Sequence, residues 1–542
     1  MSFSARDRER NLERLGGEPF DVLVIGGGIT GAGVALDAAT RGLRTALVER
    51  DDFASGTSSR SSKLVHGGLR YVNQREFRLV YEALSERQRL LRLAPHLVRP
   101  LPFLIPIFGT GTAAQAGARA YARAIGAALW LYDATGGARI GKLHRRLSRQ
   151  QTLEHMPDLD ASRLAAGFLY YDARVDDARL TLSVVKTAAG HGTVAANYVT
   201  ATGLRREGAA VRGATVTDRL TGRSFEISAG VVVNAAGVWA DDLRALDEGA
   251  HPNSIRPAKG VHITLPGGRP RLDIAAVLPV PGDRRSIFVI PWADRVYVGT
   301  TDTDYDGSLD DPVCTAADVD YLLGAVNAWV SDPVSRDEVL GTWAGLRPLV
   351  GGGVSGGKTS DLSRRHSVRM SDSGLVSIVG GKLTTYRKMA EHTVDAAVEV
   401  LVRGGRSRPR SRSRTDSVPL FGADGYEELT GGDAPARLGL PAETVSHLAG
   451  RHGGHARAVA AMVREHPDLG DPLVPGLPYL RAEALYAARY EMALTLEDVL
   501  SRRTRALLLD AAATSAAAPA VARLLAGPAA PGVTGPDEAG EA

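Results

Sequence analysis

Cysteine is nearly absent from this chain of 542 residues, which contains only Cys314. A single cysteine cannot form an internal disulfide, a cysteine pair for redox relay or a cysteine cluster for a metal ion. The composition is therefore typical of a protein from a reducing compartment.

Long hydrophobic runs are missing as well. No uninterrupted apolar stretch is long enough to cross a bilayer, and residues 1–19 carry charges but no apolar signal-peptide core. We therefore expect residues 1–19 to be an exposed N-terminal extension. We expect the protein to be cytoplasmic, with at most a peripheral attachment to the inner face of the cytoplasmic membrane.

The excess of positive charge is small and confined to one segment. The chain carries 65 Lys and Arg against 61 Asp and Glu, and six arginines lie in residues 403–414. An Arg/Ser/Pro/Gly run cannot bury apolar surface, so we interpret residues 403–416 as a mobile linker. Contact with RNA or an anionic lipid is the alternative for this segment. Elsewhere the charges nearly balance, which does not favour nucleic acid as a partner.

Residues 21–49 contain the elements of a dinucleotide-binding motif. The apolar run Val22–Ile25 predicts a buried strand, and a glycine pattern G-x-G-x-x-G follows it directly. A helix is expected over residues 29–41, with a pyrophosphate at its positive N-terminal end. No Lys followed by Ser or Thr closes the run, so the pattern does not favour a P-loop. The glycines of the pattern are Gly26, Gly28 and Gly31.

A second short strand, residues 45–48, ends at Glu49. An acidic side chain about 20 residues after the glycines accepts hydrogen bonds from the ribose hydroxyls of an adenine dinucleotide. The strand, the helix and the acidic residue all occur at the spacing that a dinucleotide-binding motif requires. The glycine pattern is therefore more specific than it would be alone.

A polar loop, residues 55–71, follows the ribose-binding acid and reads SGTSSRSSKLVHGGLRY. Its hydroxyls and backbone amides can wrap a pyrophosphate or a flavin, whereas His66, Arg70 and Tyr71 can face a substrate. A polar surface loop is the alternative interpretation.

Three later segments also place a basic residue beside Gly or Pro: KGVHITLP at 259–266, WAGLRPLVGG at 343–352 and GGKLTTYRKMAEH at 380–392. The third follows an apolar run and opens a helix, whose N-terminus would point at an anion or at a flavin. Each segment has a plainer alternative: a polar strand residue for His262, a surface ion pair for Arg347 and a solvated charge for Lys382.

The order of elements predicts an α/β fold followed by helices. Residues 231–237 suit a strand inside a parallel sheet, whereas 285–292 and 294–302 predict antiparallel strands of a second sheet. Helices are expected over 76–94, 113–132, 442–466 and 480–513, and the prolines of 95–106 forbid a helix there. The Ala-rich helix 113–132 carries Arg119, Arg123 and Trp130, so it is either an interfacial membrane helix or an amphipathic helix on its own domain.

Six strings, in this order, resemble the FAD-dependent glycerol-3-phosphate dehydrogenase family: GGGITGAG, TSSRSSKLVHGGLRY, GTTD, GLRPL, SRRH and GGKLTTYR. The resemblance covers about residues 20–395 and continues in character through ARYEMALTLEDVLSRRTR. It implies a Rossmann-type FAD-binding domain with an interleaved antiparallel-sheet substrate domain, together spanning residues 20–402. It also implies a C-terminal helical domain over residues 417–513, after which residues 514–542 are expected to be a disordered tail.

The resemblance further implies oxidation of sn-glycerol 3-phosphate at C2, with a hydride passing to flavin N5 and dihydroxyacetone phosphate released. Cationic side chains would bind the phosphate and a neutral imidazole would remove the hydroxyl proton, with His66 and His262 both open as the base. The implied substrate-binding residues are Arg70, Tyr71, Arg347, Arg364 and Lys382, of which Arg347 and Lys382 are also catalytic candidates. The implied FAD-binding residues are Gly26, Gly28, Gly31, Glu49, Thr57, Ser58, Ser62, Lys63, Gly381 and Thr384.

Several functions stay open at this stage. The expected electron acceptor is a respiratory quinone, menaquinone or ubiquinone, reached at the membrane surface, and a homodimer is a further expectation. A glycerol-3-phosphate oxidase that uses O2 shares every motif, and a related flavin oxidase of an amine or amino acid is a second alternative. From another class, a nucleotide-binding regulatory or RNA-binding protein would use the Arg/Ser run.

Overall fold

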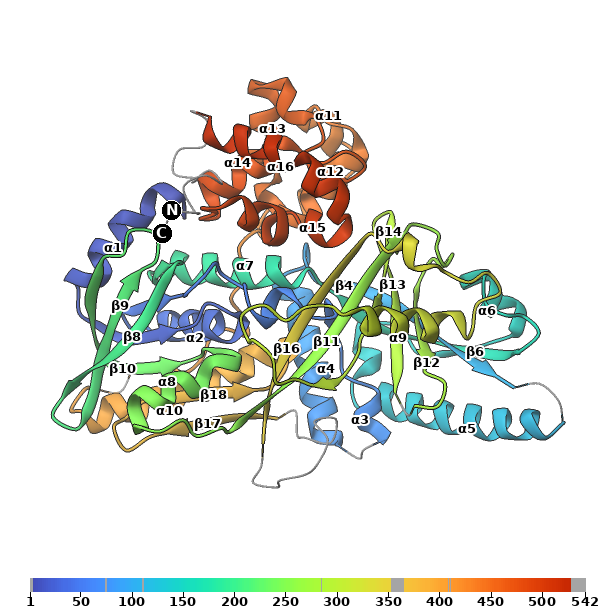
Figure 1. Ribbon diagram of the computed structural model, residues 1–542, viewed down its shortest axis with the longest axis horizontal. Coiled ribbons are helices and arrows are strands. Elements are labelled where there is room, and N and C mark those ends of the chain that lie inside the picture. Colours follow the sequence, from blue (N-terminus) through green and yellow to red (C-terminus); the bar gives the residue numbers. More distant parts are fainter. Residues whose placement is uncertain are drawn as a thin grey trace.

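The computed structural model describes residues 3–73, 76–109, 112–283, 285–351, 365–407, 409 and 411–527, with the backbone alone at 70, 73 and 112–116. Figure 1 shows two sheets side by side, with a group of helices from the end of the chain packed above them. The fold class is the predicted one: a mixed α/β structure with a parallel sheet, a second and mainly antiparallel sheet, and a C-terminal helical domain.

The first sheet is built around the glycine motif and has the strand order β17-β18-β10-β1-β2-β7. The strands from β18 to β7 run parallel, and β17 is antiparallel at the edge. Val24 and Val233 of this sheet are fully buried because helices or strands cover both of its faces. Its strands are β1 (Phe20–Ile25), β2 (Thr45–Val48), β7 (Val194–Ala196), β10 (Ser224–Asn234), β17 (His366–Met370) and β18 (Val376–Gly380).

Helices α2 (Ile29–Thr40), α7 (Asp177–Gly190) and α10 (Tyr386–Arg403) cover one face of this sheet. The helix expected over 29–41 and the inner parallel strand expected within 231–237 are thereby confirmed. The other face is covered by α1 (Arg8–Gly17) and the hairpin of β8 (Val199–Glu207) and β9 (Ala210–Asp218), which extends from β10.

The expectation of an exposed N-terminal extension is wrong for α1. Leu12 and Leu15 of this helix are almost fully buried against the first sheet, and Arg8 forms a buried ion pair with Asp218. The charged residues of the segment occupy the solvent face of an amphipathic helix, so a count of charges alone concealed its apolar stripe.

The second sheet has the strand order β15-β11-β14-β13-β12-β4-β6-β3, with β16 paired to β11 and β5 paired to β6. The expected antiparallel pair is confirmed as β13 and β14, joined at Ala293 and Asp294. The proline-rich segment 95–106 contributes the strand β4. The strands are β3 (Leu64–Val65), β4 (Arg99–Phe108), β5 (Arg145–Leu147), β6 (Leu164–Arg174), β11 (Ile255–Pro266), β12 (Ala275–Pro279), β13 (Ser286–Trp292), β14 (Arg295–Gly299), β15 (Thr303–Asp304) and β16 (Gly341–Val350).

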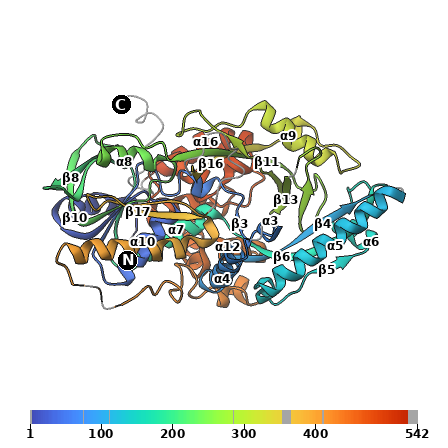
Figure 2. The same ribbon diagram turned by 90° about the horizontal axis from the view of Figure 1, so that it is seen from below.

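Helices flank the second sheet on its outer side. Figure 2 shows α5 (Thr112–Ala134) lying along the edge formed by β4, β5 and β6, at the end of the molecule remote from β8. The helices predicted over 76–94 and 113–132 correspond to α4 (Phe77–Leu93) and α5. The remaining helices beside this sheet are α3 (Arg70–Asn73), α6 (Arg149–His155) and α9 (Ala316–Asn327), whereas α8 (Ala240–Glu248) packs against the first sheet.

The C-terminal domain is helical as predicted, but each predicted helix is divided into shorter ones. The helical region also ends later in the chain than expected. The helix expected over 442–466 is broken at Gly453, where φ is +57° and the carbonyl of Gly422 leaves no room for a side chain. The helix expected over 480–513 is also interrupted, with a π-helical turn at Asp498–Arg503. The helices are α11 (Ala434–Leu438), α12 (Ala442–His452), α13 (Ala456–Glu465), α14 (Arg481–Tyr490), α15 (Ala506–Leu509) and α16 (Ala511–Ala526).

Two segments expected to be unstructured are ordered in their described parts. The expected disordered tail begins too early at residue 514, because α16 continues to Ala526 and buries Val521 and Leu525 in the C-terminal core. Within the expected mobile linker 403–416, Ser413 donates a hydrogen bond to Asp37 of α2, and Ser411 donates one to the carbonyl of Arg41. These contacts hold the linker against the C-terminal end of α2.

Candidate active site

The turn between β1 and α2 depends on two glycines. Gly26 has φ of +112°, and a side chain there would meet the carbonyl oxygen of Ala235 at 2.5 Å. A side chain at Gly31 would lie 1.8 Å from the carbonyl oxygen of Gly26. The backbone can therefore close tightly only with glycine at both positions. Gly28 is the N-cap of α2, so the N–H groups of the first helical turn have no acceptor within the helix.

Glu49 lies at the end of β2, next to this turn. Its carboxylate accepts hydrogen bonds from the backbone N–H groups of Gly27, at 2.6 Å, and Asp51, at 3.0 Å. Burial nevertheless raises the pKa of Glu49 to about 7. The structure therefore holds an acceptor group in place beside the glycine turn, at the position predicted for ribose recognition.

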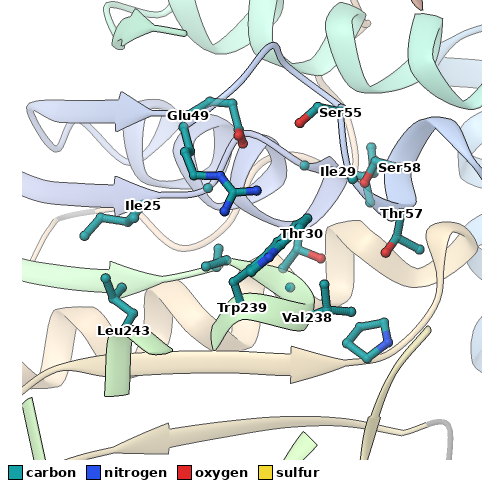
Figure 3. Close-up of a pocket in the computed structure, with 18 of the residues that line it drawn as sticks. Ile25, Ile29, Thr30, Glu49, Ser55, Thr57, Ser58, Val238, Trp239 and Leu243 are labelled. Carbon is teal, nitrogen blue, oxygen red and sulfur yellow. Dashed lines mark hydrogen bonds between the residues drawn. The ribbon is translucent and has the colours of Figure 1, made fainter. Parts of the chain in front are cut away.

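The turn and Glu49 open into a cavity of about 440 Å³, whose lining is shown in Figure 3. Its volume is in the range of small-molecule and cofactor sites. The cavity runs from the glycine turn to the strand-to-helix turn after β18, and Pro348 of β16 forms part of its wall. The sequence-predicted residues that line it are Gly26, Gly28, Glu49, Thr57, Ser58, Gly381 and Lys382.

The first part of the polar loop forms one wall of the cavity. Ser58 Oγ accepts a hydrogen bond of 2.9 Å from the backbone N–H of Ile29, in the first turn of α2. Thr57 Oγ1 donates to the carbonyl of Leu346 on β16 at 2.5 Å, which ties the loop to the second sheet. The loop therefore joins the two sheets at the cavity.

The next residues of the loop turn away from the cavity wall. Ser62 Oγ is hydrogen-bonded to His262 Nε2 at 2.9 Å, and the Lys63 ammonium is buried against Asp177, 3.1 Å from its carboxylate. Burial, followed by the charge of Arg505, lowers the pKa of Lys63 to about 8. Neither Ser62 nor Lys63 is part of the cavity lining, so their predicted contact with FAD stays a prediction.

Three rings and a glycine lie in a row across four strands of the second sheet. Trp343 on β16 pairs with His262 on β11, which pairs with Gly299 on β14, which pairs with Phe288 on β13. The absent side chain of Gly299 makes room for the imidazole, because a Cβ there would lie 2.0 Å from the His262 ring. The His66 ring packs edge-on against Phe288, with centroids 6.4 Å apart. Both candidate bases therefore lie at one face of the second sheet.

His262 is the more enclosed of the two candidates. Its side chain is buried, and among the described residues its Nδ1 has no hydrogen-bond partner. Burial and the nearby charges of Lys63 and Arg347 hold the pKa of His262 well below the ordinary value of 6.5. The imidazole is therefore neutral at physiological pH and able to accept a proton.

Arg347 lies on the same face of the sheet. Its guanidinium covers Gly260 of β11, two residues from His262 and thus on the same side of the strand. It donates hydrogen bonds to Asp302 at 3.2 Å and to Thr300 Oγ1 at 3.3 Å. These contacts fix a cation beside the imidazole while leaving its side chain 23% exposed.

Lys382 and Thr384 follow β18 and meet the second half of the polar loop. The Lys382 ammonium lies 3.7 Å from the centroid of the Tyr71 ring. Thr384 Oγ1 accepts a hydrogen bond of 3.2 Å from the backbone N–H of His66. The segments 55–71 and 380–392, far apart in the sequence, are thus brought together as the sequence motifs indicated.

Two predicted phosphate ligands are not placed by these contacts. Arg70 begins α3, where the structure describes its backbone only, and Arg364 lies outside the described residues. Their predicted roles stay predictions. The described residues contain no group of three or more His, Cys, Asp or Glu side chains arranged to hold a metal ion.

Part of the cavity wall was missed by the sequence motifs. It comes from β8 and from the segment after β10, which was recognised only as a strand ending in a Gly turn. β10 is the parallel neighbour of β1, so its carboxyl end lies at the same sheet edge, where ligands bind in open α/β sheets. The missed lining residues with side chains on this wall include Thr200, Thr202, Val238, Trp239, Asp242 and Leu243.

The residues of the cavity fit an adenine dinucleotide such as FAD. The turn formed by Gly26 and Gly31 allows a diphosphate to approach the backbone, and the N-terminus of α2 supplies N–H groups for it. The carboxylate of Glu49 is an acceptor for ribose hydroxyls, and Ser58 extends the polar wall. A dinucleotide in this cavity would lie against Pro348, whose neighbour Arg347 is on the same face of the second sheet as His262.

Known proteins share these features over most of the chain. Residues 21–387 match the family model described as FAD dependent oxidoreductase, and residues 413–529 match that of the C-terminal domain of alpha-glycerophosphate oxidase. "Glycerol-3-phosphate dehydrogenase 2" of Mycobacterium tuberculosis is 46% identical over 91% of this chain and 82% of its own length. The mitochondrial glycerol-3-phosphate dehydrogenase of Mus musculus is 39% identical over 96% of this chain and 72% of its own length.

A solved structure agrees with the sequence comparisons. The glycerol-3-phosphate dehydrogenase from Bacillus halodurans, solved in complex with FAD, superposes with a TM-score of 0.78 at 36% identity. The match covers 96% of this chain and 93% of that one.

Proposed function

The chain belongs to the FAD-dependent oxidoreductases and, among them, to the glycerol-3-phosphate dehydrogenases, and on this basis we propose that it oxidises sn-glycerol 3-phosphate to dihydroxyacetone phosphate. The observation that carries the proposal is the position of His262 and Arg347 on one face of the second sheet, with Pro348, the next residue in the chain, in the wall of the cofactor cavity. FAD held there by Gly26, Gly28, Glu49 and Ser58 would supply a two-electron acceptor for the hydride from C2.

The cationic side chains bind the phosphate of the substrate. Arg347 offers a guanidinium fork fixed by Asp302, and Lys382 offers a point charge held over the Tyr71 ring. Arg70 and Arg364 are proposed as further phosphate ligands on the sequence resemblance. A phosphomonoester carries about two negative charges near neutral pH, so several cations are needed to hold it.

We assign the role of base to His262 rather than His66. When a hydride leaves C2, the hydroxyl proton must also leave, and a neutral imidazole accepts it. His262 is kept neutral by burial and by Lys63 and Arg347, and stacking on Trp343 fixes its ring. The half-buried His66 packs edge-on against Phe288, and its backbone N–H donates to Thr384, so we propose that it helps to form the wall of the substrate site.

A respiratory quinone is the proposed electron acceptor, with the protein bound peripherally at a membrane surface. Among the described residues, no helix has both the length and the apolar character needed to cross a bilayer. The solvent face of α5 instead exposes Trp130 (63%) and Leu131 (39%), and it also carries Arg119 and Arg123. Exposed apolar side chains and arginines on one helix are suited to the boundary between anionic headgroups and acyl chains.

Product and acceptor assays test this proposal. The purified protein should form dihydroxyacetone phosphate from glycerol 3-phosphate with a menaquinone or ubiquinone analogue, and glycine or proline should not replace the substrate. Peroxide formed in equal amount to the product would instead support the oxidase alternative. Activity on amino acids alone would overturn the assignment of the substrate.

A further inference from the structure

The carbonyl groups of four consecutive loop residues, 59 to 62, are contacted by three different parts of the protein: the C-terminal domain, β14 and β16. The carbonyl of Ser59 accepts a hydrogen bond of 2.6 Å from Arg505, in the C-terminal domain. The carbonyl of Ser61 accepts one from Trp343 Nε1 at 3.3 Å, and that of Ser62 accepts one from the Tyr297 hydroxyl at 2.9 Å. The carbonyl of Arg60 packs directly against Gly345 of β16. We refer to residues 59–62 as the held segment.

Asp177 at the start of α7 connects the held segment to the C-terminal domain. Its carboxylate, which is fully buried, accepts hydrogen bonds from the backbone N–H of Ser61 at 2.9 Å and from the Ser61 hydroxyl at 2.6 Å. It also accepts a hydrogen bond of 2.5 Å from Arg505, whose side chain is 1% exposed. Lys63 completes the cluster by donating to both Asp177 and the carbonyl of Ser59.

The held segment ends at the base proposed above. Ser62 Oγ is hydrogen-bonded to His262 Nε2, and Lys63 lies 4.8 Å from the centroid of the Trp343 ring that stacks on His262. A continuous set of buried and partly buried contacts therefore runs from Arg505 through Asp177 and the held segment to His262.

We infer that Arg505 and Asp177 are positioning residues for His262, so that the C-terminal domain completes the active site without contacting the substrate. This inference rests on the proposed function, because it takes His262 as the base. The alternative is that the ion pair only fastens the two domains together. A buried cation and carboxylate can stabilise a domain contact without affecting the chemistry, so the two roles must be separated by experiment.

Arg179 provides a matched control. It also joins the domains through a buried ion pair, with Glu491 at 2.6 Å, but its guanidinium donates to Glu491, the carbonyl of Arg451 and His452 rather than to the held segment. Arg505→Met and Arg179→Met both remove a buried interdomain cation, so both should lower the melting temperature. Only Arg505→Met should loosen the held segment, and Arg505→Lys, which retains a charge toward Asp177, should partly restore it.

The first readout is hydrogen exchange measured by mass spectrometry on the FAD-loaded proteins, which does not depend on the substrate. Peptides covering residues 55–66 should exchange faster in Arg505→Met than in the wild type and should be unchanged in Arg179→Met. The second readout is the rate of flavin reduction by glycerol 3-phosphate without oxygen. That rate should fall by about 10- to 100-fold in Arg505→Met with FAD retained, because a small misplacement of a catalytic group has effects of this size.

Ser62→Ala tests the last contact of the series. It removes the hydroxyl that meets His262 but no buried charge, so it should slow flavin reduction while leaving the melting temperature nearly unchanged. If Arg505→Met and Arg179→Met lose the same rate and show the same exchange, the positioning role is refuted. If the exchange difference is found but glycerol 3-phosphate does not reduce even the wild-type flavin, the proposed function fails instead, and the role for His262 fails with it.

Discussion

The imidazole of His262 and the indole of Trp343 lie parallel, with ring centroids 4.7 Å apart and an angle of 5° between their planes. The two residues are cross-strand partners on β11 and β16, so the pairing of these strands fixes the orientation of the imidazole. The same pairing brings Arg347 over Gly260, beside the imidazole. One strand register therefore sets in place both the residue proposed as the base and the residue proposed to bind the phosphate.

His262→Gln should slow flavin reduction by glycerol 3-phosphate by about 100- to 10,000-fold, the usual contribution of a general base. FAD should stay bound, because His262 does not line the cofactor cavity. Stopped-flow absorbance under anaerobic conditions measures the rate. His66→Gln is the matched control, and a larger loss in that variant than in His262→Gln would reverse the assignment of the base.

The pH dependence of the same step follows from the depressed pKa of His262. Since burial, Lys63 and Arg347 hold that pKa well below 6.5, the imidazole stays deprotonated as the pH falls from 8 to 6. The rate of flavin reduction at saturating substrate should therefore stay level over this range. A fall in rate with a midpoint near 6.5 would show that a histidine with an ordinary pKa acts as the base.

Arg347→Ala should raise the KM for glycerol 3-phosphate by about 10- to 100-fold, which corresponds to about 1.5–3 kcal/mol for hydrogen bonds to a charged group. Arg347→Lys should give a smaller increase, because lysine retains the charge but not the bidentate fork. Steady-state kinetics with both variants provide the measurement, and the flavin spectrum reports whether FAD is retained. Unchanged kinetics in Arg347→Ala would remove this residue from the phosphate site.

We expect Glu49 to make the binding of FAD to the apoprotein depend on pH. Its pKa is raised to about 7 by burial, so the carboxylate becomes protonated as the pH falls through 7 and loses acceptor capacity for the ribose hydroxyls. FAD affinity should therefore weaken by several-fold between pH 8 and pH 6, as measured by quenching of flavin fluorescence. Glu49→Gln should bind FAD about tenfold more weakly and without this pH dependence; a wild-type affinity that strengthens on acidification would contradict the assignment.

The exposed face of α5 should bind anionic vesicles. Trp130→Ser and Leu131→Ser should each weaken sedimentation with phosphatidylglycerol vesicles by several-fold, because each removes apolar side chain that would enter the membrane interface. Leu220→Ser is the control: Leu220 is 42% exposed in the turn after β9, and Figure 1 shows β9 and α5 at opposite ends of the molecule. Equal effects of the three substitutions, or none, would argue against α5 as the membrane contact.

The cofactor cradle was predictable from the sequence because its signals are local. Gly26, Gly28, Gly31 and Glu49 lie within one strand–helix–strand unit, and a tight turn, a helix N-terminus and a strand end constrain which residues can occupy each position. The structure places these residues where the spacing indicated. The wall that contains Trp239 carries no such signal, since it depends on β10 lying beside β1.

Other features depend on contacts between distant segments. The burial of α1 and the ordering of residues 411–416 on α2 follow from surfaces that other elements provide. Arg505 is the last residue of the segment ARYEMALTLEDVLSRRTR, which resembles the C-terminal domain of the family. Nothing in the sequence indicates that its partner is Asp177, more than 300 residues away. Sequence patterns indicate which polar residues are candidates for a buried site. Which of these residues contact one another depends on the fold.

Anaerobic mixing of the purified, FAD-loaded protein with sn-glycerol 3-phosphate tests the proposed function most directly. The oxidised flavin absorbs at about 450 nm, and oxidation of the substrate should bleach this band with one dihydroxyacetone phosphate formed per flavin. A band that persists at millimolar glycerol 3-phosphate, in a protein whose flavin dithionite reduces normally, would contradict the assignment of this substrate.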